Sequence, residues 1–436
     1  MESLFSPLQD LFLTHGFDKT YWVAYSGGLD SHVLLHALAQ LRSDQPLRLR
    51  AIYVNHCLSP NASQWAQHCA TVCESLQIDF QEEVIDANAA IGQSPEEVAR
   101  QSRYSIFSKL ISAGDILLTA HHQNDQAETL LLQMLRGAGP KGLAAMPSLK
   151  VFAKGFHARP WLNLTREELQ EYAEQHHLRW IEDESNTNTA FSRNFIRHEV
   201  LPILKKRWPT VTETLTRVAH HCAESQQLLD QFMQQDLERV KGLLPRSLSI
   251  KKLVALDDAR QRQVLRGWLQ ELGFPIPQTT KILQIQRDML YAREDKMPHF
   301  CWSGVELRRF RDHLCAMPAL QEFDAAQVFK WDFSQPLVLP QVGCLHATPV
   351  LGQGLRADSE HVTVRFRQGG ESCRLPGREQ HHDLKKLFQE WGVPTWERER
   401  LPLIYVGKKL AAVVGFFVSD EFAAGREEQG YVFSQS

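Results

Sequence analysis

A short polar loop, Ser26-Gly27-Gly28-Leu29-Asp30-Ser31, directly follows the apolar run Trp22–Tyr25. The stretch Ser31–Leu41 then carries apolar residues at helical spacing, so we predict a strand, a glycine turn and a helix in succession. Consecutive glycines let backbone N–H groups turn inward, and a helix N-terminus favours an anion. The loop therefore predicts a phosphate site; the plainer alternative is a glycine turn that only joins strand to helix.

Two common nucleotide-binding motifs are absent from this loop. No Gly-Lys-Ser/Thr ends it, so it lacks the lysine that binds the β- and γ-phosphates in P-loop NTPases. The spacing G-x-G-x-x-G of dinucleotide-binding folds is not met either. The predicted phosphate site is therefore of another type.

The first part of the chain, to about residue 185, alternates strand and helix signals, which predicts an α/β fold with a doubly wound, mostly parallel sheet. Capping boxes at Ser94–Glu97 and Thr165–Glu168 mark the starts of two helices. The expected strands are Trp22–Tyr25, Leu49–Val54, Phe80–Ile85, Ile116–Ala120, Phe156–Trp161 and a short one near Arg179–Ile181.

Polar residues follow four of these strands. They are Ser26 with its loop, Asn55-His56, His121-His122 and Glu182-Asp183. Because ligands of such sheets bind beyond the carboxyl ends of the strands, we expect these groups to share one rim.

Carboxylates and arginines supply further candidates near this rim. Asp125, Glu128 and Thr129 share one face of a predicted helix, where the two carboxylates could hold Mg²⁺ at nucleotide phosphates. The alternative is that they only favour the helix N-terminus. Arg100 and Arg103 on the predicted helix Pro95–Leu110 could stabilise charge on a phosphorus atom, or could be surface arginines.

The rest of the chain divides by pattern. We expect a catalytic domain at 1–215, a helical middle domain at 216–315, a linker with β-strands at 316–353 and a small α/β C-terminal domain at 354–436. One long amphipathic helix is predicted from Pro209 to about Lys241. No apolar run approaches the ~20 residues of a membrane helix, and no signal peptide is evident, so we expect a cytoplasmic protein without membrane contact.

The eight cysteines form no C-x-x-C pair, so the sequence predicts neither a disulfide framework nor a structural metal. Cys69 and Cys73 are expected to be buried thiols. The net charge of −3 does not indicate a nucleic-acid binder, but residues 186–219 and 365–409 each carry a local charge of +4. Such stretches are usually solvated faces and can also bind a phosphate backbone.

At these residues the chain resembles a known family. Ser26–Ser31 looks like the signature loop of the N-type ATP pyrophosphatases, or PP-loop family, and the chain is similar to the bacterial tRNA(Ile)-lysidine synthetases over essentially its whole length. Asn55-His56-Cys57 departs from the Asp-His-Gly usual in that family, although His56 is retained. The other matching segments are Val54–His56 with Leu58, His121–Thr129, Asp183–Asn186, Arg193–Arg197, Arg365–Gly370, Lys385–Phe388, Val393-Pro394 and Arg400–Pro402.

The resemblance implies ligation of free L-lysine to carbon 2 of the wobble cytidine of tRNA(Ile) with a CAU anticodon, through an adenylated intermediate, using ATP and Mg²⁺ in a monomer or homodimer. The catalytic candidates are Asp30, Arg103 and Asp125. The ATP-binding candidates are Ser26, Gly27, Gly28, Leu29, Asp30, Ser31, His56 and His121, with Asp125 and Glu128 for Mg²⁺ or lysine. The tRNA-binding candidates are Arg193, Asn194, Arg197, Lys205, Lys206, Arg207, Arg365, Arg367, Lys385, Lys386, Arg398 and Arg400.

Three other functions stay open. A tRNA thiolase of the same superfamily would need a reactive cysteine or a C-x-x-C cluster, and only Cys57 lies near the rim. An amidating relative would need a glutaminase domain, which we do not expect because the chain leads straight from Met1 to the loop. An RNA-binding scaffold would not need the intact rim.

Overall fold

The computed structural model describes residues 2–57, 59–85, 95–293, 296–356, 361–375 and 380–436. Within it the chain forms two compact units, one ending at Gln231 and the other beginning at Phe232. The capping box expected at Ser94 and the residue Leu58 lie outside the described residues. Among the described residues, no helix is long and apolar enough to cross a membrane.

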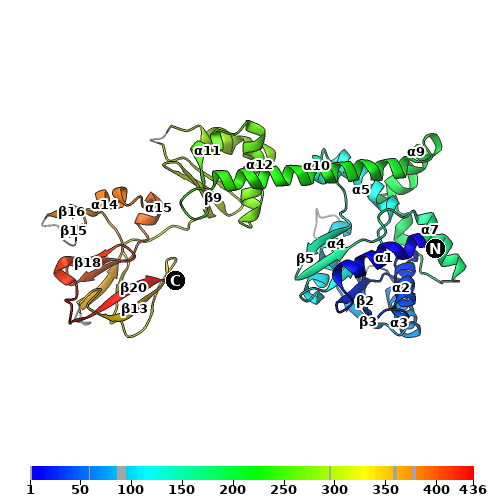
Figure 1. Ribbon diagram of the computed structural model, residues 1–436, viewed down its shortest axis with the longest axis horizontal. Helices are drawn as coiled ribbons and strands as arrows, with labels where there is room; N and C mark the ends of the chain where they lie inside the picture. Colours follow the sequence, from blue (N-terminus) through cyan, green and yellow to red (C-terminus); the bar gives the residue numbers. More distant parts are fainter. Residues whose placement is uncertain (1, 58, 86–94, 294–295, 357–360, 376–379) are drawn as a thin grey trace. The chain divides into compact units, whose positions relative to one another are not determined.

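The first unit contains one six-stranded sheet, which confirms the predicted α/β fold (Figure 1). All neighbouring strands are parallel except the last pair, an antiparallel hairpin that the sequence analysis did not predict. In sheet order the strands are β3 Asp79–Val84, β2 Arg48–Asn55, β1 Thr20–Ala24, β4 Ile116–Leu118, β6 Gly155–Ala158 and β5 Leu149–Phe152.

Helices cover both faces of this sheet because each central strand is apolar on both sides. Val23 of β1 packs with residues of α1, α2, α3 and α7, whereas its neighbour Trp22 packs with Phe107 of α4. Cys69 and Cys73 are fully buried in the first cluster, as predicted. The helical segments are α1 Glu2–His15, α2 Leu29–Arg42, α3 Ala62–Ser75, α4 Pro95–Leu110, α5 Gln123–Leu135, α6 Pro140–Leu143, α7 Arg166–Gln175, η1 Glu184–Thr187, α8 Ser192–Phe195, η2 Ile196–Val200 and α9 Leu201–Arg207. The long helix α10 Val211–Val240 includes the boundary between the two units at Gln231.

The segment Arg179–Ile181, expected as a strand, is irregular. The N–H of Ile181 donates to the carbonyl of Gly27 at 2.9 Å. The segment therefore contacts the glycine loop through this backbone hydrogen bond and does not pair with it as a strand. The capping box at Thr165 forms as predicted, with Thr165 and Glu168 bonding each other's backbone.

The second unit begins with helices and a four-stranded antiparallel sheet, so the part expected as a helical middle domain at 216–315 also contains strands. The sheet order is β7 Ser247–Ser249, β10 His313–Pro318, β9 Val305–Phe310 and β8 His299–Trp302. One buried cluster joins this sheet to α11 Ile250–Val254, α12 Asp258–Glu271, α13 Thr279–Ile285 and η3 Gln286–Leu290.

The remainder of the second unit forms three small antiparallel sheets. Residues 316–353, expected as a linker with β-strands, contribute three strands to them, and β13 pairs with the last strand of the chain. In sheet order the strands are β11 Val328–Lys330, β14 Val362–Arg365, β17 Leu403–Val406, β18 Lys409–Val413 and β19 Phe417–Val418; then β12 Leu337–Leu339, β13 Gly343–Leu351 and β20 Gln429–Gln435; then β15 Ser372–Arg374 and β16 His381–Asp383. The helical segments are α14 Leu384–Glu390, α15 Thr395–Arg398 and η5 Asp420–Phe422.

Candidate active site

The glycine loop joins the end of β1 to the start of α2, at the carboxyl edge of the sheet. Gly27 has a φ of +80°, and a Cβ atom there would lie 2.6 Å from Ile181 Cδ1 and 2.9 Å from Cys69 Sγ. A side chain at position 27 would therefore meet both an unfavourable backbone conformation and buried neighbours. The fold requires glycine here.

Two serines hold the loop closed. The Ser31 hydroxyl accepts a hydrogen bond from the Ser26 N–H at 3.2 Å and donates to the Gly28 carbonyl at 3.0 Å. Gly28 is the N-cap of α2 and offers no side-chain acceptor to the first N–H groups of the helix. These N–H groups are free to bind an anion, and the helix dipole favours one.

His122 links this loop to α5. Its Nε2 lies 3.4 Å from Asp125 Oδ2 and 3.7 Å from Asp30 Oδ2. Burial lowers the pKa of His122, but the carboxylates of Asp125 and Asp30 outweigh this effect and raise it above its ordinary value. The other Asp30 oxygen, Oδ1, is buried and has no hydrogen-bond partner among the described residues. Asp30 is therefore available to a bound cation.

Asp125 and Glu128, expected to bind Mg²⁺ or lysine, pair with Arg193 and Arg197, which were expected to bind tRNA. Arg193 donates to Glu128 Oε2 at 2.7 Å and to Asp125 Oδ1 at 2.8 Å. Arg197 donates to Glu128 Oε1 at 2.6 Å and to Asp125 Oδ1 at 3.1 Å. A divalent ion could bind Glu128 only by displacing a guanidinium. This arrangement favours an ion-pair cluster over a magnesium site.

His56 and Arg103 meet at the end of β2. The Arg103 Nε donates to His56 Nε2 at 3.3 Å, and burial together with the Arg103 charge lowers the pKa of His56 to about 4. Cys57 has a φ of +55°, which explains why glycine suits this position in the resembling family. Asn55 has a structural role, because its side chain accepts from the Cys57 N–H and donates to Glu82.

A polar chain that the sequence analysis missed lies beneath His121. The Thr119 hydroxyl lies 2.8 Å from His121 Nδ1 and 2.9 Å from His157 Nε2, and Arg159 lies 3.1 Å from His157 Nδ1. Burial lowers the pKa of His121 to about 3 and that of His157 to about 2. Both imidazoles are therefore neutral at pH 7. His157 lies inside β6 and Arg159 directly follows it, so both fall within the predicted strand Phe156–Trp161 and the rule that takes the residues after a strand did not find them.

The remaining tRNA-binding candidates of the first unit differ in their exposure and in their hydrogen-bond partners. The Asn194 amide donates to the carbonyls of Ser185 and Asn188 and so supports the 184–188 turn. Lys205 lies 3.3 Å from Glu167 across an exposed pair, while Lys206 and Arg207 are exposed.

In the second unit, Lys385 and Lys386 are exposed, but Arg398 is buried and its Nε donates to the Val393 carbonyl at 2.9 Å. Arg398 is thus placed to hold backbone rather than RNA. Arg367 lies near Glu371, and Arg400 covers the Phe323 ring.

A pocket of about 690 Å³ opens beside β14 and β17 in the second unit. Four basic side chains line it, against the acidic Glu371 and Glu421. The basic residues are Arg365, Arg374, Lys408 and Lys409. The pocket therefore has a positive balance suited to a phosphate-bearing ligand.

Three family models match successive parts of the chain. The chain matches the family models described as PP-loop domain at residues 6–204, TilS substrate binding domain at 248–315 and TilS substrate C-terminal domain at 362–434. Among solved structures, the U34-tRNA thiolase NcsA from Methanococcus maripaludis is similar with a TM-score of 0.44 at 18% identity, covering 51% of this chain and 79% of that chain.

Curated relatives are similar over nearly the whole length. The tRNA(Ile)-lysidine synthase of Coxiella burnetii is 46% identical over 95% of this chain and 92% of its own length. The tRNA(Ile)-lysidine synthase of Methylococcus capsulatus is 40% identical over 95% of each chain. The glycine loop, its rim and this similarity together identify the chain as a member of the tRNA(Ile)-lysidine synthase family.

Proposed function

We propose that this chain ligates free L-lysine to carbon 2 of the wobble cytidine of tRNA(Ile) with a CAU anticodon. The product, lysidine, changes the codon that the tRNA reads from AUG to AUA. The observation that carries the proposal is the 46% identity over 95% of the chain to a protein named for this activity, joined to an intact glycine loop. Such tRNA chemistry belongs to the bacterial cytoplasm.

In the first step, ATP binds with its phosphates on the loop Ser26–Ser31, where free N–H groups and the α2 dipole favour the anion. The 2-carbonyl oxygen of the cytidine attacks the α-phosphorus, and the bond between the α-phosphorus and the bridging oxygen to the β-phosphate breaks. Pyrophosphate leaves, and the base is adenylated. Arg103 is the cation that we assign to the developing charge on phosphorus.

In the second step, the lysine ε-amine attacks carbon 2, and AMP leaves with the oxygen. A free lysine ammonium has a pKa of about 10.4, so it must lose a proton before attack. We assign Asp30 to bind this cation and accept the proton, because its buried Oδ1 is unpaired among the described residues. Asp125 is less suited, since it already accepts from Arg193 and Arg197.

Mg²⁺ supplies neutralisation of the triphosphate charge when ATP is bound. Asp30 fits such an ion for the same reason that it fits lysine, whereas Glu128 accepts from guanidinium groups at both oxygens. Asp30 therefore serves either the first step or the second, and the two roles need separate measurements.

The test follows pyrophosphate release and incorporation of labelled lysine separately, with and without ATP, in wild type and Asp30→Asn. If Asp30 serves lysine, pyrophosphate release persists and lysine incorporation falls at least ~100-fold, the scale of a lost general base. If Asp30 serves ATP, both steps fail. Asp44→Asn, at an exposed position beyond the other end of α2, is the matched control. No lysine incorporation by the wild-type chain would overturn the proposal.

A tRNA thiolase remains the second candidate, with less support from the relatives. It would require the exposed thiol Cys57, which lies beside His56 at the rim. Cys57→Ser should leave lysine incorporation within about twofold of wild type. The same change would abolish sulfur transfer by a thiolase.

We also assign tRNA contacts to the second unit. The pocket lined by Arg365, Arg374, Lys408 and Lys409 is proposed to take RNA phosphates. Lys385 and Lys386, which are exposed and lie between Arg374 and Lys408 in the sequence, are proposed to bind RNA phosphates as well. The buried Arg398 is left out of this surface.

A further inference from the structure

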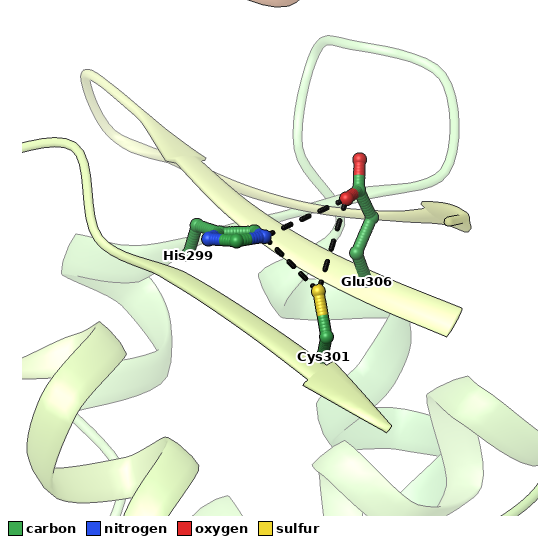
Figure 2. Close-up of side chains that lie close together, drawn as sticks. All are labelled: His299, Cys301 and Glu306. Atoms are coloured by element: carbon green, nitrogen blue, oxygen red, sulfur yellow. Dashed lines mark hydrogen bonds and ion pairs between the residues drawn. The ribbon is translucent and has the colours of Figure 1, made fainter. Parts of the chain in front are cut away.

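A cluster of metal-ligating side chains lies on the sheet of the second unit, remote in sequence from the PP-loop (Figure 2). His299 and Cys301 are two residues apart on β8, so their side chains share one face. Cys301 is paired in register with Glu306 of β9, which brings the carboxylate to the same face. The hairpin therefore collects an imidazole, a thiol and a carboxylate at one place.

The three ligand atoms converge on one point. Cys301 Sγ lies 3.0 Å from His299 Nε2 and 3.9 Å from Glu306 Oε2, and His299 Nε2 lies 3.7 Å from the same oxygen. Tetrahedral zinc with usual bond lengths separates a sulfur and a nitrogen ligand by ~3.6 Å, nitrogen and oxygen by ~3.4 Å, and sulfur and oxygen by ~3.6 Å. The observed separations differ from these by ~0.3–0.6 Å, which side-chain rotation can supply.

The arrangement does not suit a nucleophilic cysteine. In a catalytic triad, the thiol bonds one imidazole nitrogen and the carboxylate orients the ring through the other. Here the thiol and the carboxylate both face Nε2 of His299. Two groups directed at the same nitrogen could share an ion after small side-chain rotations, and they give no relay.

Arg308 bonds the same carboxylate, and its shorter bond goes to Oε1, the oxygen other than the one that faces His299 and Cys301. Its Nε donates to Glu306 Oε1 at 2.7 Å, and its Nη2 lies 3.3 Å from Oε2. Glu306 is buried, whereas His299 and Cys301 are exposed, so an ion could reach the cluster from solvent. Outer hydrogen bonds of this kind fix a ligating carboxylate in metal sites. A thiolate and a carboxylate also neutralise a divalent cation beside this guanidinium.

We propose that His299, Cys301 and Glu306 form a zinc site with three protein ligands and a water in the fourth position. A thiolate with an imidazole selects zinc over Mg²⁺ or Ca²⁺, which prefer oxygen ligands. The bound ion joins β8 to β9, and the thiol proton passes to solvent when it binds. This site has no C-x-x-C pair, since two of its ligands lie two residues apart on β8 and the third lies opposite them on β9. The sequence analysis therefore did not predict it.

To test this site, the full, reduced chain is titrated with Co²⁺, and the bound Co²⁺ is then displaced with Zn²⁺. We expect a thiolate-to-cobalt charge-transfer band that saturates at one equivalent and disappears as zinc is added. Cys301→Ser should lose the band and weaken zinc binding at least tenfold. Cys301→His should also lose the band but keep zinc binding near the wild-type value, which separates ligation from a merely structural effect. Cys57→Ser removes the other exposed thiol among the described residues and should keep the band.

Folding is checked by far-ultraviolet circular dichroism. If Cys301→Ser is unfolded, His299→Ala carries the test, since its exposed side chain can be removed without opening the core. It should weaken zinc binding at least tenfold. A band that survives in Cys301→Ser, a band lost in Cys57→Ser, or zinc affinity unchanged in His299→Ala would overturn the site. So would the absence of a thiolate band in the wild-type chain.

Discussion

Glu128→Gln tests the ion-pair cluster of the first unit because it removes one charge and keeps the shape. Glu128 is fully buried, and both its oxygens accept from the guanidinium groups of Arg193 and Arg197. The substitution leaves two guanidiniums facing the single carboxylate of Asp125. We expect it to destabilise the contact between α5 and the α8–η2 segment.

The magnitude follows from the burial of the partners. Breaking a buried ion pair costs about 3–5 kcal/mol because the remaining charge loses its partner. The side chains of Arg193 and Arg197 are 21% and 30% exposed, so water offsets part of that cost. We therefore expect a loss of about 2–3 kcal/mol, or a ~30- to ~150-fold increase in local opening.

Hydrogen exchange in peptides covering α5 measures this opening directly. A local readout is needed because the two units need not unfold together. Glu167→Gln is the matched control, since Glu167 faces Lys205 across an exposed pair at 3.3 Å and its loss should cost less than ~0.5 kcal/mol. Exchange in Glu128→Gln that is no faster than in the control would refute the stabilising role of the ion pairs. So would Mg²⁺ that protects α5 in wild type but not in the variant, because Glu128 would then hold the ion.

Three shorter predictions concern the loop, the rim and the polar chain. Gly27→Ala should lower tRNA-dependent ATP–pyrophosphate exchange more than ~10-fold, because the new Cβ would meet Ile181 and Cys69 and a φ of +80° is strained for alanine. Gly137→Ala is the control. Its φ is +69° but its Cβ would have no neighbour within 4 Å, so exchange should stay near the wild-type rate. Cys57→Gly should raise the free energy of unfolding by about 0.5–1 kcal/mol in urea titration, since it relieves a positive φ, and an unchanged midpoint would contradict this. Burial lowers the pKa of His157 to about 2, so the folded protein keeps this imidazole neutral while the unfolded chain takes up a proton below pH ~6.5. The free energy of unfolding should therefore fall by about 2 kcal/mol between pH 7 and pH 5. This contribution of His157 should vanish in His157→Gln.

The sequence predicted the parts of the site that depend on local pattern. The glycine loop and the start of α2 follow from a strand signal, two glycines and helical spacing, and Gly27 indeed has a left-handed backbone. The sheet rule also placed His56 and His121 at strand ends. These features need only neighbours within a few residues in the chain.

Pairing between distant segments could not be predicted in the same way. Arg193 and Arg197 belong to a basic stretch whose local charge is typical of a nucleic-acid surface, and their partners lie more than 60 residues earlier. Net charge counts residues without showing which of them meet. The same limit applies to Arg398, whose burial depends on how α15 packs.

The ion-pair cluster also decides what the rim can bind. If Asp125 and Glu128 of α5 were unpaired, their charges would add to that of Asp30 in the first turn of α2. Each carboxylate within 4 Å of a bound phosphate would cost about 1 kcal/mol even in water-like surroundings. Arg193 and Arg197 cancel two of these charges. Asp30 then remains as the one carboxylate of the three that no guanidinium neutralises among the described residues. A rim with one carboxylate that no guanidinium neutralises, beside free N–H groups, suits an anion and a single cation together, as the proposed reaction between ATP and a lysine ammonium requires.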